Sequence, residues 1–167
     1  MDKKTIIIIL IVAFALVGGL VVLGYSNAGE ATQAQSNASS TLTASTTLYD
    51  FGTISMANGK VDHLFEITNP TSKDVNINTI STSCMCTTAY FVNGTTKDGP
   101  FGMSGMGFTY PSTANEVVPA NSSREIDVQF DPAAHGPAGI GDIDRTIYIG
   151  QTNGGTLQLE IKAVVTP

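Results

Sequence analysis

The chain begins with a long apolar run and continues with short segments in which apolar and polar residues alternate. The run from Thr5 to Tyr25 contains no charged residue. At about 1.5 Å per residue in a helix it measures roughly 31 Å, which matches the hydrocarbon core of a membrane. Lys3 and Lys4 precede the run, and the next cation along the chain is Lys60. The positive-inside rule therefore predicts one transmembrane helix with a cytoplasmic N-terminus and an extracytoplasmic C-terminal part.

A cleaved signal peptide is the alternative for this segment. Ser26-Asn27-Ala28 offers the small residues that a signal peptidase prefers, and cleavage there would leave Gly29 at the N-terminus. The apolar run is longer than the core of about 7–15 residues in most signal peptides, which favours an uncleaved anchor.

The next segment, residues 26–47, is rich in Ser, Thr, Ala and Asn and has almost no large apolar side chain. It cannot bury enough surface to offset the entropy lost on ordering. We therefore expect three regions. Residues 1–25 form a cytoplasmic stub and signal anchor, residues 26–47 a flexible linker, and residues 48–167 one folded domain.

From Leu48 onward, apolar residues recur at every second position, which is typical of strands with one face in a core. Turn-forming sequences such as Ala57-Asn58-Gly59 separate these segments. The pattern predicts an all-β sandwich, with two longer loops at residues 93–115 and 131–142. The expected core consists of the apolar members of the alternating segments: Phe51, Phe65, Ile67, Ile77, Ile126, Val128, Phe130, Ile147 and Leu159.

The charge pattern excludes one functional class. The chain has a formal net charge of -6, and its few cations are scattered. A nucleic-acid-binding protein needs a cluster of Lys and Arg, so we expect no nucleic-acid partner. The sequence also lacks a nucleophile–base motif, a phosphate loop and a metalloprotease motif, so we expect no enzyme.

Cys84 and Cys86 are the only cysteines of the chain, and three interpretations remain open for them. Residues two apart on a strand point to the same face, so two thiolates could hold one soft ion such as Cu(I). Met103 and Met106, in the glycine-rich loop that follows, could add thioether ligands. A disulfide between such close residues would be strained and easily reduced. Both thiols could also pack as small apolar side chains.

The remaining candidate ligands have simpler explanations. His63 falls on the apolar side of an alternating segment, so we expect a core histidine. His135 lies in a loop, and we expect it to be exposed to solvent. For Met103 and Met106 the alternative is that they pin their loop onto an apolar surface. Asp142 and Asp144 are too few for a calcium loop, and we expect them to be solvated.

Five segments follow one another along the chain in a distinctive order: Tyr49-Asp50-Phe51-Gly52-Thr53-Ile54, Phe65-Glu66-Ile67-Thr68-Asn69, Ser83-Cys84-Met85-Cys86-Thr87, Val118-Pro119-Ala120-Asn121-Ser122 and Ile126-Asp127-Val128-Gln129-Phe130-Asp131. Through these segments the chain resembles, over roughly Leu48 to Val165, the bacterial immunoglobulin-like family known as domain of unknown function 1573, which is related to Hydin-like immunoglobulin domains. The family has Cys-Gly-Cys-Thr where this chain has Cys84-Met85-Cys86-Thr87.

The resemblance implies an immunoglobulin-like β-sandwich of about seven strands and a location in the cell envelope, but no biochemical activity. Together with the predicted anchor, it leads to the hypothesis of a membrane-anchored, extracytoplasmic, non-enzymatic module. Such a module would bind or scaffold another envelope or surface protein that the sequence does not identify. The alternative is a soft-metal, Cu(I)-binding or thiol-redox module built on Cys84 and Cys86.

Overall fold

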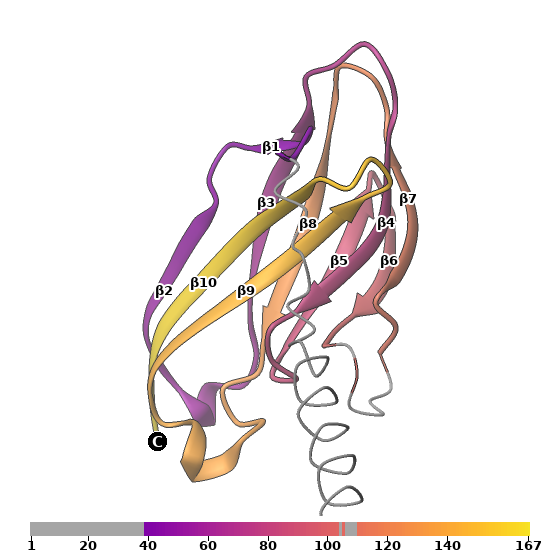
Figure 1. Cartoon of the computed structure of the whole chain (residues 1–167). Coiled ribbons are helices and arrows are strands. Elements are labelled where there is room, and N and C mark those ends of the chain that lie inside the picture. Colours follow the sequence, from indigo (N-terminus) through magenta and orange to yellow (C-terminus); the bar gives the residue numbers. More distant parts are fainter. Residues whose placement is uncertain (1–38, 104, 106–109) are drawn as a thin grey trace, which may run out of the picture. The chain divides into compact units, whose positions relative to one another are not determined.

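The computed structural model describes residues 39–103, 105 and 110–167, which form a sandwich of two five-stranded sheets (Figure 1). The predicted anchor from Thr5 to Tyr25 lies outside these residues. Within them, no helix is long and apolar enough to cross a membrane.

Each sheet combines strands that are distant in the sequence. The first sheet has the order β1-β3-β8-β5-β6, with β1 Thr43–Ala44, β3 Val61–Asn69, β8 Ser122–Phe130, β5 Thr87–Asn93 and β6 Thr96–Phe101. The second has the order β2-β10-β9-β4-β7, with β2 Leu48–Ser55, β10 Thr156–Thr166, β9 Gly141–Gln151, β4 Val75–Thr82 and β7 Thr113–Val118. Two 3-10 helices, η1 Met56–Asn58 and η2 Gly136–Gly139, lie in connections. Only β2 and β10 pair in parallel; the other pairs among these strands are antiparallel.

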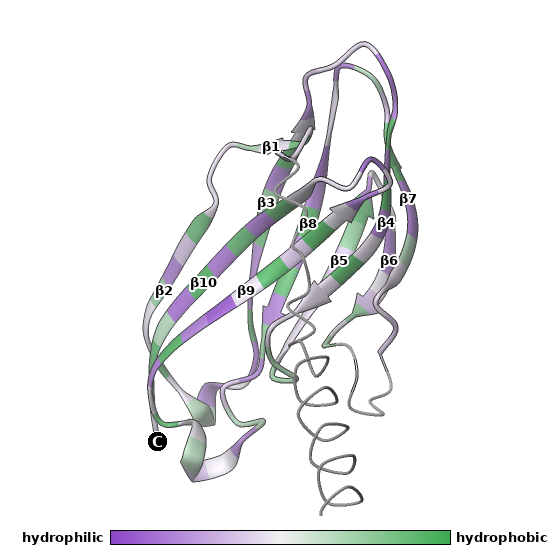
Figure 2. Cartoon of the chain, in the orientation of Figure 1, coloured by the Kyte–Doolittle hydropathy of each residue, from purple (hydrophilic) through white to green (hydrophobic). Residues whose placement is uncertain are grey.

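Alternation along the strands builds the core, as Figure 2 shows in the green and purple bands of β3, β9 and β10. In β10 the residues that point inward are buried, while their neighbours are exposed or half-buried. All the predicted core residues are buried except Phe51, which is half-buried on the edge strand β2 and packs against the core. The predicted all-β sandwich is therefore confirmed.

His63 does not lie in the core as expected. It is half-buried and stacks on Tyr49 of β2, with ring centroids 3.6 Å apart. Burial lowers the pKa of His63, and the neighbouring charge of Asp62 opposes that shift. Tyr49 belongs to the other sheet, so this stacking joins the two layers of the sandwich.

The expected number of about seven strands is wrong, because the described residues form ten. Residues 93–115, expected to form one long loop, contain β6 and the first residues of β7, and these strands pair with β5 and β4. Both are edge strands, and each buries only one face over a few residues. Such a strand needs few alternating apolar residues. In a segment rich in turn-forming residues, the sequence pattern therefore does not indicate it.

The predicted linker boundary is also wrong, because the fold begins before Leu48. Leu42 is only 1% exposed and belongs to the core, and β1 pairs with β3. The side chain of Gln151 fixes the preceding residues: its Oε1 accepts from the Thr41 amide at 3.1 Å, and its Nε2 donates to the Ser40 hydroxyl at 2.6 Å. The burial of Leu42, the pairing of β1 and the hydrogen bonds of Gln151 together attach this polar segment to the domain.

Candidate thiol and metal site

The two cysteines lie in the tight connection between β4 and β5. The Thr87 amide donates to the Cys84 carbonyl oxygen at 3.2 Å, and the Thr82 hydroxyl lies 2.9 Å from the same oxygen. Asn121 is the only non-glycine residue with positive φ among the described residues, so Met85 adopts an ordinary backbone conformation. The turn therefore accepts Met85 without backbone strain at the position where the family pattern has glycine.

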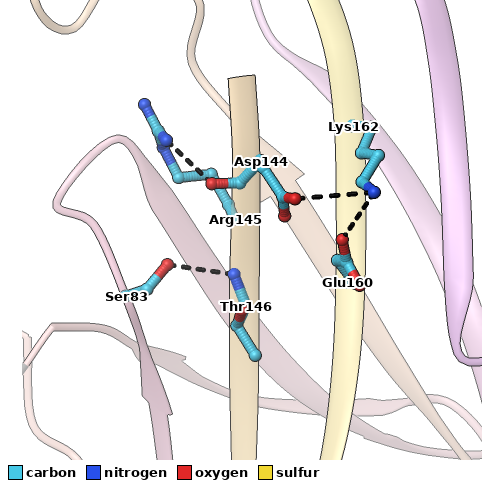
Figure 3. Close-up of polar contacts among 6 residues, drawn as sticks. All are labelled: Ser83, Asp144, Arg145, Thr146, Glu160 and Lys162. Carbon is cyan, nitrogen blue, oxygen red and sulfur yellow. Dashed lines mark hydrogen bonds and ion pairs between the residues drawn. The ribbon is translucent and has the colours of Figure 1, made fainter. Parts of the chain in front are cut away.

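A pair of hydrogen bonds joins this turn to β9. The Ser83 amide donates to the Thr146 carbonyl oxygen at 2.9 Å. The Thr146 amide donates in return to the Ser83 hydroxyl, also at 2.9 Å (Figure 3). This pair of hydrogen bonds, here called the clamp, also places Arg145, the residue before Thr146 in β9, beside the turn. The Arg145 Nε donates to the Cys86 Sγ at 3.3 Å. Its Nη1 donates to the Asp144 carbonyl oxygen at 2.8 Å, the contact that Figure 3 draws.

The loop after β8 approaches the same turn from the other sheet. The Asp131 amide donates to the Cys86 carbonyl oxygen at 2.9 Å. The Asp131 carboxylate then accepts from the Ala133 amide at 2.9 Å, which turns the chain toward His135. The Nε2 of His135 lies 3.1 Å from the Cys84 Sγ.

These contacts gather three potential ligand atoms at one place. The two sulfurs and a ring nitrogen of His135 all lie within 4.8 Å of one another. Neither cysteine forms a disulfide, and the Cys86 thiol donates to the Cys84 sulfur at 2.6 Å. Cys84 is half-buried, Cys86 is buried and His135 is exposed, so the cluster opens to solvent on its Cys84 and His135 side.

The environment gives the two thiols different acidities. Burial raises the pKa of Cys84, but hydrogen bonds from Cys86 and His135 and the charge of Arg145 outweigh it and lower that pKa to about 7. Burial raises the pKa of Cys86, and its hydrogen bond to Cys84 raises it further, against the opposing effect of Arg145. The arrangement therefore favours a thiolate at Cys84 and a neutral thiol at Cys86, which donates to it.

The structure brings together some of the predicted ligands. Cys84 and Cys86 lie close together, although a turn rather than an extended strand places them so. Met103 is half-buried, and the pairing of Phe101 with Ala89 puts it at the end of the sheet where β5 begins beside the cysteines. Met106 lies outside the described residues. A thioether ligand from either methionine stays a prediction.

The sequence did not indicate that His135 and Arg145 contact the two cysteines. His135 is exposed, as the sequence predicted, yet it contacts Cys84. The loop sequence from Asp131 to Gly136 gives no signal for this contact, because it depends on the pairing of Thr87 with Phe130 between β5 and β8. Arg145 could have been noticed as a cation within an otherwise alternating strand.

The fold is shared with other proteins of low sequence identity. A protein of unknown function from Porphyromonas gingivalis W83 is 14% identical with a TM-score of 0.53, over 74% of this chain and 46% of that one. A family 123 glycoside hydrolase from Clostridium perfringens is 8% identical with a TM-score of 0.50, over 72% of this chain and 23% of that one. The PapD-like domain 7 of human CEP192 is 14% identical with a TM-score of 0.44, over 77% of this chain and 87% of that domain.

This chain spans less than half of the Porphyromonas protein and of the hydrolase. No curated protein matches it. At these identities the likeness concerns the fold alone, a β-sandwich of two sheets.

The family model that matches is that of the protein of unknown function DUF1573, over residues 42–103. The match begins at the buried Leu42, includes the cysteine turn and ends at Met103. The resemblance stated from the sequence is thus confirmed over residues 42–103, where this chain is similar to the DUF1573 family and folds as part of a sandwich of two five-stranded sheets.

Proposed function

We propose that this chain is a membrane-tethered, extracytoplasmic immunoglobulin-like module that captures a soft metal ion, Cu(I), with Cys84, Cys86 and His135. One observation carries the proposal: both sulfurs and an imidazole nitrogen lie within 4.8 Å of one another. Thiolates are the preferred ligands of Cu(I), and imidazole also suits copper. Hard cations such as Ca²⁺ and Mg²⁺ prefer oxygen ligands and are rejected.

The site can adjust to an ion on its open side. Two thiolates on one ion, at metal–sulfur distances of about 2.3 Å, lie roughly 3.5–4 Å apart. The two sulfurs lie 2.6 Å apart, so an ion shared by both thiolates requires them to move apart. The buried Cys86 is held by Arg145 and by the amide of Asp131, whereas Cys84 is half-buried. Rotation of the Cys84 side chain therefore opens the space, and His135 closes it from the solvent side.

Met103 and Met106 have a subsidiary role in this proposal. A thioether is a neutral ligand, and it would complete the coordination of an ion already held by two thiolates. Replacement of both methionines by leucine is then expected to weaken Cu(I) binding without abolishing it.

The N-terminal sequence supports the location. The charge-free run from Thr5 to Tyr25, behind Lys3 and Lys4, has the length and the flanking charges of an N-in anchor. In this role the partner is another envelope protein that supplies or accepts the ion. Met85, which lies between the cysteines and is 43% exposed, offers an apolar contact at the site.

The test is a titration of the full-length chain, reduced and kept anaerobic in a mild detergent, with Cu(I) against a coloured chelator. The wild-type chain is expected to take Cu(I) from the chelator, and the variant carrying both Cys84→Ser and Cys86→Ser to take none. His135→Ala should weaken binding, and His63→Ala, which removes the other histidine, should not.

Equal copper content in the wild type and the double serine variant would refute the proposal. A free-thiol count then identifies the role of the pair. Loss of both thiols on exposure to a small disulfide would indicate a redox pair, and two persistent thiols would indicate a structural one.

A further inference from the structure

We infer that Arg145 makes the site selective for a monovalent soft ion over a divalent one. The inference rests on the proposed function, since it concerns which ion the same ligands hold. The ligands alone do not decide this, because two cysteines and one histidine also bind Zn²⁺ in sites with an open position. Selection must therefore come from a group beside the ligands, and Arg145 is such a group.

Two hydrogen bonds hold the Arg145 side chain against the site, one to a cysteine sulfur and one to a backbone carbonyl oxygen. Its Nε donates to the Cys86 Sγ at 3.3 Å, and its Nη1 donates to the Asp144 carbonyl oxygen at 2.8 Å. The clamp between Ser83 and Thr146 holds the cysteine turn and β9 in register (Figure 3). A guanidinium stays charged at any pH that a protein tolerates, so this position carries a permanent positive charge.

No carboxylate neutralises that charge within the described ranges, where Arg145 forms no ion pair. The adjacent carboxylate of Asp144 is directed at Lys162, with Oδ2 and Nζ 3.5 Å apart, and Lys162 also lies 2.9 Å from Glu160. Figure 3 shows this group on one side of the β9 ribbon and the guanidinium on the other. The charge of Arg145 is therefore available to the thiolates.

The charge count then distinguishes the two classes of ion. Two thiolates with a monovalent ion carry a net charge of minus one, which Arg145 neutralises at hydrogen-bond distance of Cys86. Two thiolates with a divalent ion are neutral, and Arg145 leaves an uncompensated positive charge at a partly buried site. Arg145 therefore stabilises the monovalent complex and does not stabilise the divalent one. Arg145 does not touch the ion; it acts on the site through the thiolate of Cys86.

The experiment compares affinities for Cu(I) and Zn²⁺, each measured by chelator competition on the reduced full-length chain in detergent. Arg145→Gln removes the charge and keeps hydrogen-bond donors. Lys162→Gln is the matched control, because it removes the same charge from the neighbouring strand. We expect Arg145→Gln to lower the ratio of Cu(I) to Zn²⁺ affinity by roughly tenfold or more, the size of one hydrogen bond to a charged group. Lys162→Gln should leave the ratio within about twofold of wild type.

Three other outcomes would contradict the inference, each for a different reason. If Arg145→Gln keeps the wild-type ratio while the wild type binds Cu(I), then Arg145 does not select and the proposed function stands. If Lys162→Gln lowers the ratio as much as Arg145→Gln does, the effect is one of overall charge and not of this contact. If wild type and the double serine variant bind Cu(I) equally, both the inference and the proposed function fail.

Discussion

Replacing Leu42 by alanine tests where the folded domain begins. Leu42 is 1% exposed and packs in the core, although it lies in a polar segment ahead of the first long strand. A buried Leu→Ala change costs about 2–5 kcal/mol, from lost apolar burial and from the cavity left behind. For a domain of this size each kcal/mol lowers the melting temperature by about 3–4 °C, so we expect a decrease of roughly 6–20 °C.

Leu48→Ala is the matched control. Leu48 is 47% exposed on β2, so the same chemical change should alter the free energy of unfolding by no more than about 0.5 kcal/mol. Thermal unfolding of a fragment that starts at residue 26, followed by circular dichroism, measures both variants. A fragment that starts at residue 48 should melt below even the Leu42→Ala variant, because it also loses β1 and the contacts of Gln151. Equal melting temperatures for the two alanine variants would show that the segment before Leu48 is a passive linker after all.

Three further predictions concern the thiols, a buried amide and the anchor. In the metal-free chain Cys84 should react with iodoacetamide faster than Cys86, with a midpoint near pH 7, because its pKa is lowered to about 7 while that of Cys86 is raised. The lowered pKa also means that the Cys84 thiolate stabilises the fold fully above about pH 9 and loses this effect as the pH falls through about 7; a stability that rises toward acid pH would contradict it. Asn69→Ala should lower the free energy of unfolding in urea by about 2 kcal/mol or more. The buried side-chain amide donates to three backbone carbonyl oxygens at 2.8–3.2 Å and accepts a hydrogen bond from a backbone amide. An unchanged midpoint would exclude that role. The full chain should stay in the membrane fraction with an intact mass that includes Thr5–Tyr25, and a mature N-terminus at Gly29 would instead indicate cleavage.

Much of the sandwich could be predicted, because several of its strands show the alternation of apolar and polar residues within their own sequence. In β10 every second residue is apolar, and in β3 Val61, Phe65 and Ile67 share one face. A side-chain period of two is compatible with a strand and incompatible with a helix. Burial then follows from the pattern, as Phe65 and Leu159 illustrate. The edge strands β6 and β7 escaped prediction, because an edge strand gains its stability from hydrogen bonds to a neighbour that the local sequence does not name.

For the site, too, the sequence indicated some features and the tertiary structure decided the others. The sequence by itself determined that two thiols lie two residues apart, that the fold is all-β and that the chain opens with a charge-free apolar run. Only the tertiary structure decided what lies beside the thiols. His135 reaches Cys84 from a loop 51 residues away, and Arg145 reaches Cys86 from a strand 59 residues away. The physical reason is that these contacts depend on the register of β5 with β8 and of β4 with β9, which backbone hydrogen bonds set between distant segments.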